Sequence, residues 1–129
     1  MINLPIFRAF SETFDKYILG VPYFSDGRYY MLVDDCNKNN NIGSGSYPID
    51  ETTLAIHFPD MLDSQGNEIF ASLQKNRRGG DVCSVNDYIH GGLNGVAIYQ
   101  KYGFRIDRKG KAMGISLSST DIKIIGIQQ

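Results

Sequence analysis

The chain of 129 residues has no tryptophan, only two cysteines, no long apolar run and almost no net charge. Cys36 and Cys83 lie far apart and are too few for the disulfide framework of a small secreted domain, so we expect reduced thiols in an intracellular protein; a disulfide between them is the alternative. The opening stretch contains Pro5 and Arg8, and no apolar run reaches the roughly 18 residues of a membrane span. The sequence therefore predicts neither a signal peptide nor a transmembrane helix.

The net charge of −1 gives no overall attraction to nucleic acid or to a membrane surface. The two halves differ, because residues 1–60 carry four Lys/Arg and eight Asp/Glu, whereas residues 61–129 carry nine and six. This asymmetry is compatible with a binding face, but an ordinary solvated surface explains it more simply.

The chain is rich in residues that favour strands and tight turns: eight Tyr, seven Phe and 14 Gly. Its length fits a single domain over residues 1–129. We predict a mainly β fold with one short helix, arranged as a small, partly open β-barrel or a strongly bent antiparallel sheet.

Hydrophobic patterning locates the predicted elements. A first hairpin precedes Gly20, although a capping-box helix from Ser11 competes with it. Residues 34–46 form the longest polar stretch and are predicted as a loop. The predicted strands are residues 6–10, 16–19, 28–33, 52–58, 81–89, 95–100, 104–107, 113–117 and 122–127.

The one predicted helix covers residues 67–79. Asn67 can cap its N-terminus, Ile69 and Leu73 share one face, and Gly79 can end it. Basic residues fall in its last turn, where they complement the helix dipole.

Two glycine doublets bracket the stretch GGDVCSVNDYIHGG at residues 79–92. A phosphate-binding loop normally follows a strand and opens a helix. Gly79-Gly80 instead follows the predicted helix and precedes a strand, so we predict no nucleotide site. We interpret Gly91-Gly92 as a turn between two strands.

One polar stretch partly matches a calcium-binding loop. Asp35, Asn37 and Asn39 resemble the start of such a loop, but Asn40 and Ser46 stand where Gly and Glu are needed. A solvated loop is therefore the better interpretation.

Four further residues could ligate zinc or form a Cys–His pair, namely Cys36, His57, Cys83 and His90. They lack the close spacing of structural zinc sites, and nothing nearby lowers a thiol pKa. We therefore predict no metal, no cofactor and no catalytic residue.

The sequence KYGFRIDRKGK at residues 101–111 interleaves bases with aromatic residues, a pattern that suits single-stranded nucleic acid. The simpler interpretation is that Phe104 faces the core while Arg105 and Asp107 face water. A nucleic-acid site would require this hairpin and the end of the predicted helix to share one face. Its candidate residues are Lys75, Arg77, Arg78, Lys101, Tyr102, Arg105, Arg108, Lys109 and Lys111.

Three stretches together resemble the YopX-like family of small phage and prophage proteins. Residues 7–10 (FRAF) resemble its opening Arg-Ala-aromatic strand. Residues 63–70 (DSQGNEIF), followed by residues 80–82 (GDV), are similar to its core motif, and residues 122–126 (IKIIG) resemble its closing strand. Residues 71–79 stand where the family has a single Glu, which suggests an insertion, and Ile127 replaces a family Asn.

The resemblance implies a mostly β protein of phage or prophage origin that acts in the cytoplasm of a bacterial host, and it brings no catalytic residues. We predict a non-enzymatic accessory protein, a protein-binding or assembly module that uses edge strands or an exposed aromatic patch, with self-association as one form of this. The alternative is a regulatory or single-stranded nucleic-acid-binding β domain.

Overall fold

The computed structural model describes residues 5–34, 39, 42–87, 91–100, 103–108, 111–113 and 121–129. All regular structure in these ranges is β, and none of the described residues forms a helix that is long and apolar enough to cross a membrane. The strands are β1 (Ile6–Ser11), β2 (Lys16–Ser25), β3 (Arg28–Val33), β4 (Gly45–Pro48), β5 (Asp50–His57), β6 (Ala71–Ser72), β7 (Asp81–Asp87), β8 (Gly91–Gln100), β9 (Gly103–Arg108), β10 (Lys111–Met113) and β11 (Asp121–Ile127).

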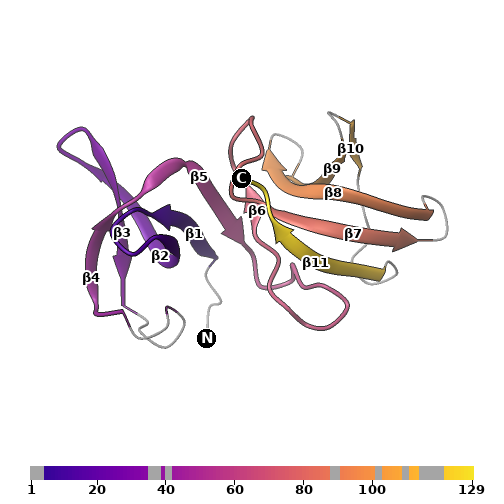
Figure 1. Cartoon of the computed structure of the whole chain (residues 1–129), viewed down its shortest axis with the longest axis horizontal. Coiled ribbons are helices and arrows are strands. Elements are labelled where there is room, and N and C mark those ends of the chain that lie inside the picture. The colour runs from indigo at the N-terminus through magenta and orange to yellow at the C-terminus, as the bar shows by residue number, and fades with distance from the viewer. Residues whose placement is uncertain are drawn as a thin grey trace.

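The strands form one mixed sheet that curls into a half-barrel (Figure 1). The main path runs β10-β9-β8-β6-β5-β1-β2-β3-β4, and β7 joins β11 to β8 beside it. Every pairing between these strands is antiparallel except that of β6 with β8. The prediction of a mainly β fold with a partly open barrel or strongly bent sheet is confirmed.

Two hydrophobic clusters fill the two lobes of the ribbon in Figure 1. The N-terminal cluster consists of Ala9, Ile18, Met31, Val33, Ile42 and Ile49. The C-terminal cluster consists of Met61, Ile69, Ala71, Cys83, Val85, Ala97, Ile106 and Ile122. The sheet passes from one lobe to the other through β5 and β6.

The first hairpin and the strands at residues 28–33, 52–58 and 122–127 are confirmed as β1–β2, β3, β5 and β11. The tight turn between β2 and β3 holds Asp26 at φ 51° and Gly27 at φ 76°. Positive φ at both central residues matches the twist of the flanking strands, so this turn sets the register of the hairpin.

The predicted helix over residues 67–79 is wrong. Ala71 pairs with Ile56 of β5, and Ser72 pairs in parallel with Ile98 of β8, so the segment supplies the short central strand β6. Every residue from 69 to 72 is buried, which suits a strand with neighbours on both edges rather than an amphipathic helix. Turns follow, with Arg77 at φ 65°.

The glycine doublets also differ from the prediction. Gly91-Gly92 opens β8 and pairs with residues 86–87, rather than forming the turn between strands. Gly79-Gly80 follows the turn after β6 and precedes β7, with no helix before it in the described part of the chain. Residues 88–89 and 114–117, which the sequence predicts as strand, lie outside the described residues.

A buried ion pair links the two lobes. The Nη2 atom of Arg8 in β1 donates to the Oδ1 atom of Asp81 in β7 at 2.9 Å and to the carbonyl oxygen of Gly79 at 2.7 Å. The guanidinium lies 4.5 Å from the ring centroid of Phe70, whose backbone N–H donates to Asp81 Oδ2 at 2.8 Å. Burial raises the pKa of Asp81, although the nearby Arg8 charge opposes this shift.

This ion pair joins the FRAF stretch to the GDV stretch, and Phe70 belongs to the core motif between them. The described contacts therefore give these residues a structural role. They hold β1, the end of the loop before β6, and β7 in one buried contact.

A second polar centre ties the loop before β6 to β11. The carboxylate of Asp63 accepts hydrogen bonds from the backbone N–H groups of Gln65 (2.9 Å) and Asn67 (2.8 Å). Ser64 exchanges two 2.8 Å bonds with the backbone of Ile122. Burial alone would raise the pKa of Asp63, but bonds from Asn67, Gln65 and Ile124 outweigh it and lower the pKa below the ordinary 3.8.

We expect Asp63 to make folding stability depend on acid. Its pKa is lower in the folded than in the unfolded state, so its contribution is complete above the unfolded pKa and is lost as the pH falls through the folded pKa. Asp63→Asn should therefore flatten the loss of unfolding free energy below about pH 4. Urea unfolding at a series of pH values measures this, and an unchanged acid slope in Asp63→Asn would contradict it.

Candidate functional site

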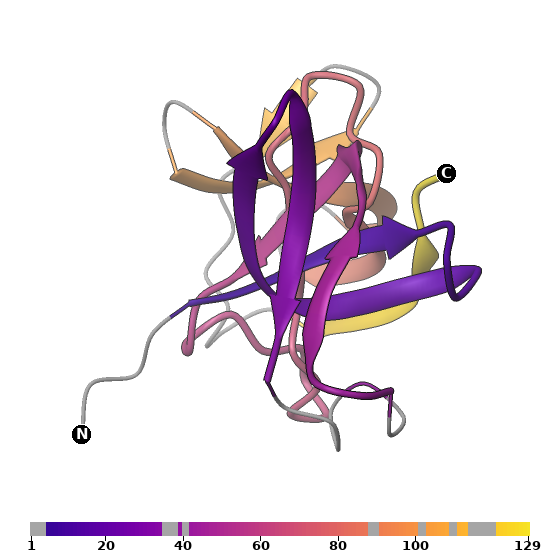
Figure 2. The same ribbon diagram turned by 90° about the vertical axis from the view of Figure 1, so that its left-hand side faces the viewer.

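The most exposed apolar surface in the described residues lies on the hairpin of β2 and β3, which projects from the N-terminal lobe (Figure 2). Two cross-strand pairs share one face of it, Val21 with Leu32 and Tyr23 with Tyr30. The exposed fractions are 58% for Val21, 39% for Tyr23 and 46% for Leu32. We call these four residues the outer hairpin face.

The two tyrosines form a flat platform. Their rings stack with centroids 5.6 Å apart and planes 21° from parallel. Cross-strand aromatic pairs stabilise a hairpin, but a pair on an exposed face also leaves a contiguous apolar surface.

The opposite face of the same hairpin is core at its base and aromatic at its tip. Met31 is fully buried, whereas Phe24 is 59% exposed and makes an edge contact with Tyr29 at 5.0 Å. Next to its turn the hairpin is thus aromatic on both faces.

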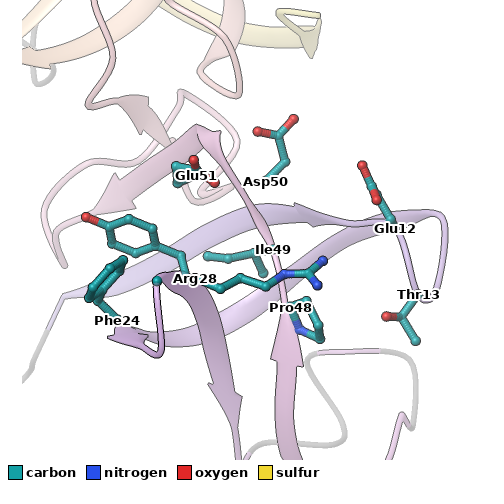
Figure 3. Close-up of a pocket in the computed structure, with 10 residues that line it drawn as sticks. Glu12, Thr13, Phe24, Arg28, Pro48, Ile49, Asp50 and Glu51 are labelled. Carbon is teal, nitrogen blue, oxygen red and sulfur yellow. The ribbon is translucent and has the colours of Figure 1, made fainter.

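A groove of about 690 Å³ lies beside this tip. Figure 3 shows the Arg28 side chain reaching across it from the hairpin toward the side of Glu12 and Thr13. Its lining residues are Glu12, Thr13, Phe24, Gly27, Arg28, Tyr29, Pro48, Ile49, Asp50 and Glu51. Three carboxylates against one guanidinium give the groove a negative potential, which disfavours phosphate groups.

One of the three carboxylates is held in place by a neighbouring residue of β5 and by Arg78. Asp50 accepts hydrogen bonds from the backbone N–H (3.0 Å) and hydroxyl (2.6 Å) of Thr52, and it lies 3.5 Å from the guanidinium of Arg78. This arrangement caps the start of β5 and leaves its carboxylate less available to a ligand than an unpaired one.

Two edges of the sheet are poor templates for an added strand. Next to β4, the Ile49 N–H donates to the carbonyl oxygen of Tyr29 in β3. The register therefore turns the backbone groups of Ser46 and Pro48 toward the free edge, where proline has no N–H to donate to an added strand. In β11, the backbone of Ile122 is already bonded to Ser64. The edge-strand alternative is therefore weaker at these two strands than docking on a face.

The nucleic-acid alternative requires the basic residues at 75–78 and those of the hairpin at 101–111 to share one face. The structure does bring the turn after β6 against the β8–β9 hairpin. Arg77 Nη1 lies 3.2 Å from Asp107 in β9, and Gln100 donates to the Gln74 carbonyl at 3.3 Å. The two arginines of this turn are nevertheless held by acidic partners, because Arg78 contacts Asp50.

The remaining nucleic-acid candidates fall into three groups. Lys75 is exposed, and Arg105 donates to the backbone oxygen of Phe104 at 2.9 Å. Arg108 and Lys111 lie in β9 and β10, where only the backbone is described. Lys101, Tyr102 and Lys109 lie outside the described residues.

The cysteine and histidine candidates have separate, ordinary partners. Burial, with Asp81 and Asp63 nearby, raises the pKa of the Cys83 thiol to about 12, so the reactive thiolate is scarce at neutral pH. His57 is buried, with Nδ1 3.0 Å from the Ile69 carbonyl and Nε2 3.3 Å from Glu68.

Cys36, His90 and the calcium-loop positions Asp35, Asn37 and Asn40 lie outside the described residues. The described part of the chain holds no group of three or more His, Cys, Asp or Glu side chains arranged around one point.

The sequence patterning described above does not identify the outer hairpin face, although a signal for it exists. Most positions in residues 21–24 and 29–33 are apolar or aromatic, without the alternation of a half-buried strand. Such a run on both strands of a hairpin makes both of its faces apolar. One face packs on the core, so the other face stays exposed unless another layer or another protein covers it.

Comparisons of the chain with protein-family models, curated proteins and solved structures found no match. The resemblance to the YopX-like family stays a prediction.

Proposed function

We propose that the chain is a non-enzymatic protein-binding and assembly module whose docking surface is the outer hairpin face. The observation that carries this proposal is the stacked Tyr23–Tyr30 platform beside exposed Val21 and Leu32. Aromatic residues that present a large rigid surface at low entropic cost are the residues that anchor protein interfaces.

Charge favours a protein over a nucleic acid at this hairpin. Bases could stack on tyrosines, but the adjoining groove is lined by the carboxylates of Glu12, Asp50 and Glu51 and by a single basic side chain, Arg28, while Arg78 pairs with Asp50. Among the basic candidates that the structure describes, Arg77 is paired with Asp107 and Arg78 with Asp50. The proposal therefore places binding on an apolar face rather than on phosphate contacts.

The biological setting that we propose rests on the sequence resemblance. A YopX-like origin makes the chain a phage or prophage accessory protein in the cytoplasm of a bacterial host. Two of the stretches that carry the resemblance meet in the fold, where Arg8 of FRAF pairs with Asp81 of GDV.

Photocrosslinking tests the docking surface. A benzophenone amino acid replaces Tyr23 in one variant and Ile125, an accessible apolar residue of β11 that is 52% exposed, in a matched control. We expect crosslinks to a defined protein from position 23 only. The protein identified should then bind the purified chain, and Tyr23→Ser should weaken that binding at least about tenfold, since loss of an interface hot spot costs about 2 kcal/mol or more.

Equal crosslinking from positions 23 and 125, or binding that Tyr23→Ser leaves unchanged, would contradict the docking proposal. The nucleic-acid alternative has its own test, which is retention on single-stranded DNA over a salt series. A steep loss of retention with rising salt would support phosphate contacts. We expect no such salt dependence.

A further inference from the structure

One end of the outer hairpin face carries the tyrosine platform, and the other end adjoins a hollow. The tyrosine platform lies toward the hairpin tip, and a hollow of about 170 Å³ lies at the hairpin base. Leu19, Val21 and Tyr23 alternate along β2 and so point to the same side of the sheet. The hollow is lined by Pro5, Ile6, Leu19, Gly20, Val21, Asp34 and Asn39.

The hollow fits the chemistry of a tyrosine ring. Its walls include Pro5, Ile6 and Leu19, and its volume exceeds the roughly 150 Å³ of an apolar cavity that binds benzene. Asp34 also lines the hollow, and its carboxylate can accept a hydrogen bond from a phenol.

We propose that the outer hairpin face binds the same face of a second copy of this chain, so that one ring of the tyrosine platform of each copy enters the hollow of the other. This inference rests on the proposed function and names its partner. A two-fold axis that lies in the plane between the two faces, runs across the strands and passes over Val21 and Leu32 exchanges platform and hollow, which is the self-complementarity that a closed dimer requires.

Charge and spacing agree with this arrangement. Leu19 and Tyr23 lie four residues apart on one strand, about 13 Å, which leaves room for the Val21–Leu32 pair to pack on its copy at the axis. The outer hairpin face itself carries no charged side chain. The two-fold axis places Asp34 opposite the tyrosines of the second copy rather than opposite that copy's own carboxylate.

The dimer should be weak. A single hairpin face offers less than the roughly 800 Å² that each partner contributes to a standard stable interface. We therefore expect an equilibrium between monomer and dimer that shifts with protein concentration in the micromolar range.

Sedimentation velocity of the purified chain over a concentration series tests the inference. We expect a concentration-dependent dimer, weakened at least about tenfold by Tyr23→Ser, which removes part of the platform, and by Val21→Arg, which places a charge at the hollow and the axis. Ile125→Ser is the matched control and should leave association unchanged. Circular dichroism, and a thermal midpoint equal to that of the parent at concentrations where the parent is monomeric, show that each variant is folded.

Disulfide trapping tests the symmetry. Because residue 21 lies near the proposed axis, Val21→Cys should form a disulfide-linked dimer faster than Ile125→Cys under the same oxidant, both in a Cys36→Ser background. A chain that stays monomeric at every concentration, or a dimer that neither Tyr23→Ser nor Val21→Arg weakens, would overturn the inference. Crosslinking from position 23 to a different protein would in that case leave the proposed function standing.

Discussion

Replacing Asp81 with alanine should lower the free energy of unfolding by about 3–5 kcal/mol, because it leaves the guanidinium of Arg8 buried without its carboxylate. Asp81 is 2% exposed, so water cannot easily replace it as a partner for Arg8. The substitution also removes the acceptor of the Phe70 N–H. Chemical denaturation at neutral pH measures the change.

The double variant Arg8→Met, Asp81→Asn separates the ion pair from the packing around it. It removes both charges, and the new amide oxygen can still accept from Phe70. Since burial raises the pKa of Asp81 in spite of Arg8, the cost of desolvating the pair is not fully repaid. We expect the double variant to be more stable than Arg8→Met alone by about 1–3 kcal/mol. The opposite result is that Arg8→Met and Asp81→Asn each lower the free energy of unfolding only slightly, with the double variant losing the sum of the two. That result would contradict this account of the link between the lobes.

Replacing Gly79 with alanine should cost about 3 kcal/mol or more. Gly79 has φ 81°, which L-residues disfavour by about 1–2 kcal/mol, and a Cβ atom there would lie 1.8 Å from the carbonyl oxygen of Thr53. The backbone must move to relieve this contact, which adds about 1–3 kcal/mol and displaces the carbonyl that Arg8 binds. Urea unfolding of the variant beside the parent chain measures the loss.

Gly66→Ala is the matched control for Gly79→Ala. Gly66 has nearly the same φ, 83°, but a Cβ atom added there would have nothing within 4 Å. It should therefore lose only the conformational cost of about 1–2 kcal/mol. Equal losses of unfolding free energy in the two variants would contradict this prediction. They would mean that a Cβ atom at residue 79 fits beside the carbonyl oxygen of Thr53 without cost.

Local patterning in the sequence was enough to find most of the strands. The apolar runs at residues 28–33 and 122–127 are local signals, and both strands form as expected. The segment at residues 67–79 carries equally local helix signals, yet its backbone bonds go to β5 and β8. Tertiary pairing overrides weak propensity in such a short segment.

The candidate docking surface depends on tertiary structure in a different way. The apolar runs at residues 21–24 and 29–33 are visible in the sequence, but which face stays exposed depends on how the sheet curls around Met31. The Arg8–Asp81 contact likewise joins residues 73 positions apart, which no spacing rule predicts. The resemblance drew attention to both residues without pairing them.

Hydroxyl-radical footprinting of the hairpin tyrosines, in the isolated dilute chain and in its assembled state in cell extract, tests the central claim most directly. Tyr23 and Tyr29 are almost equally exposed, 39% and 38%, but lie on opposite faces of the same hairpin. If the outer hairpin face is the docking surface, oxidation of Tyr23 and Tyr30 should fall several-fold on assembly while that of Tyr29 changes little. Unchanged oxidation of Tyr23, or protection of Tyr29 alone, would contradict it.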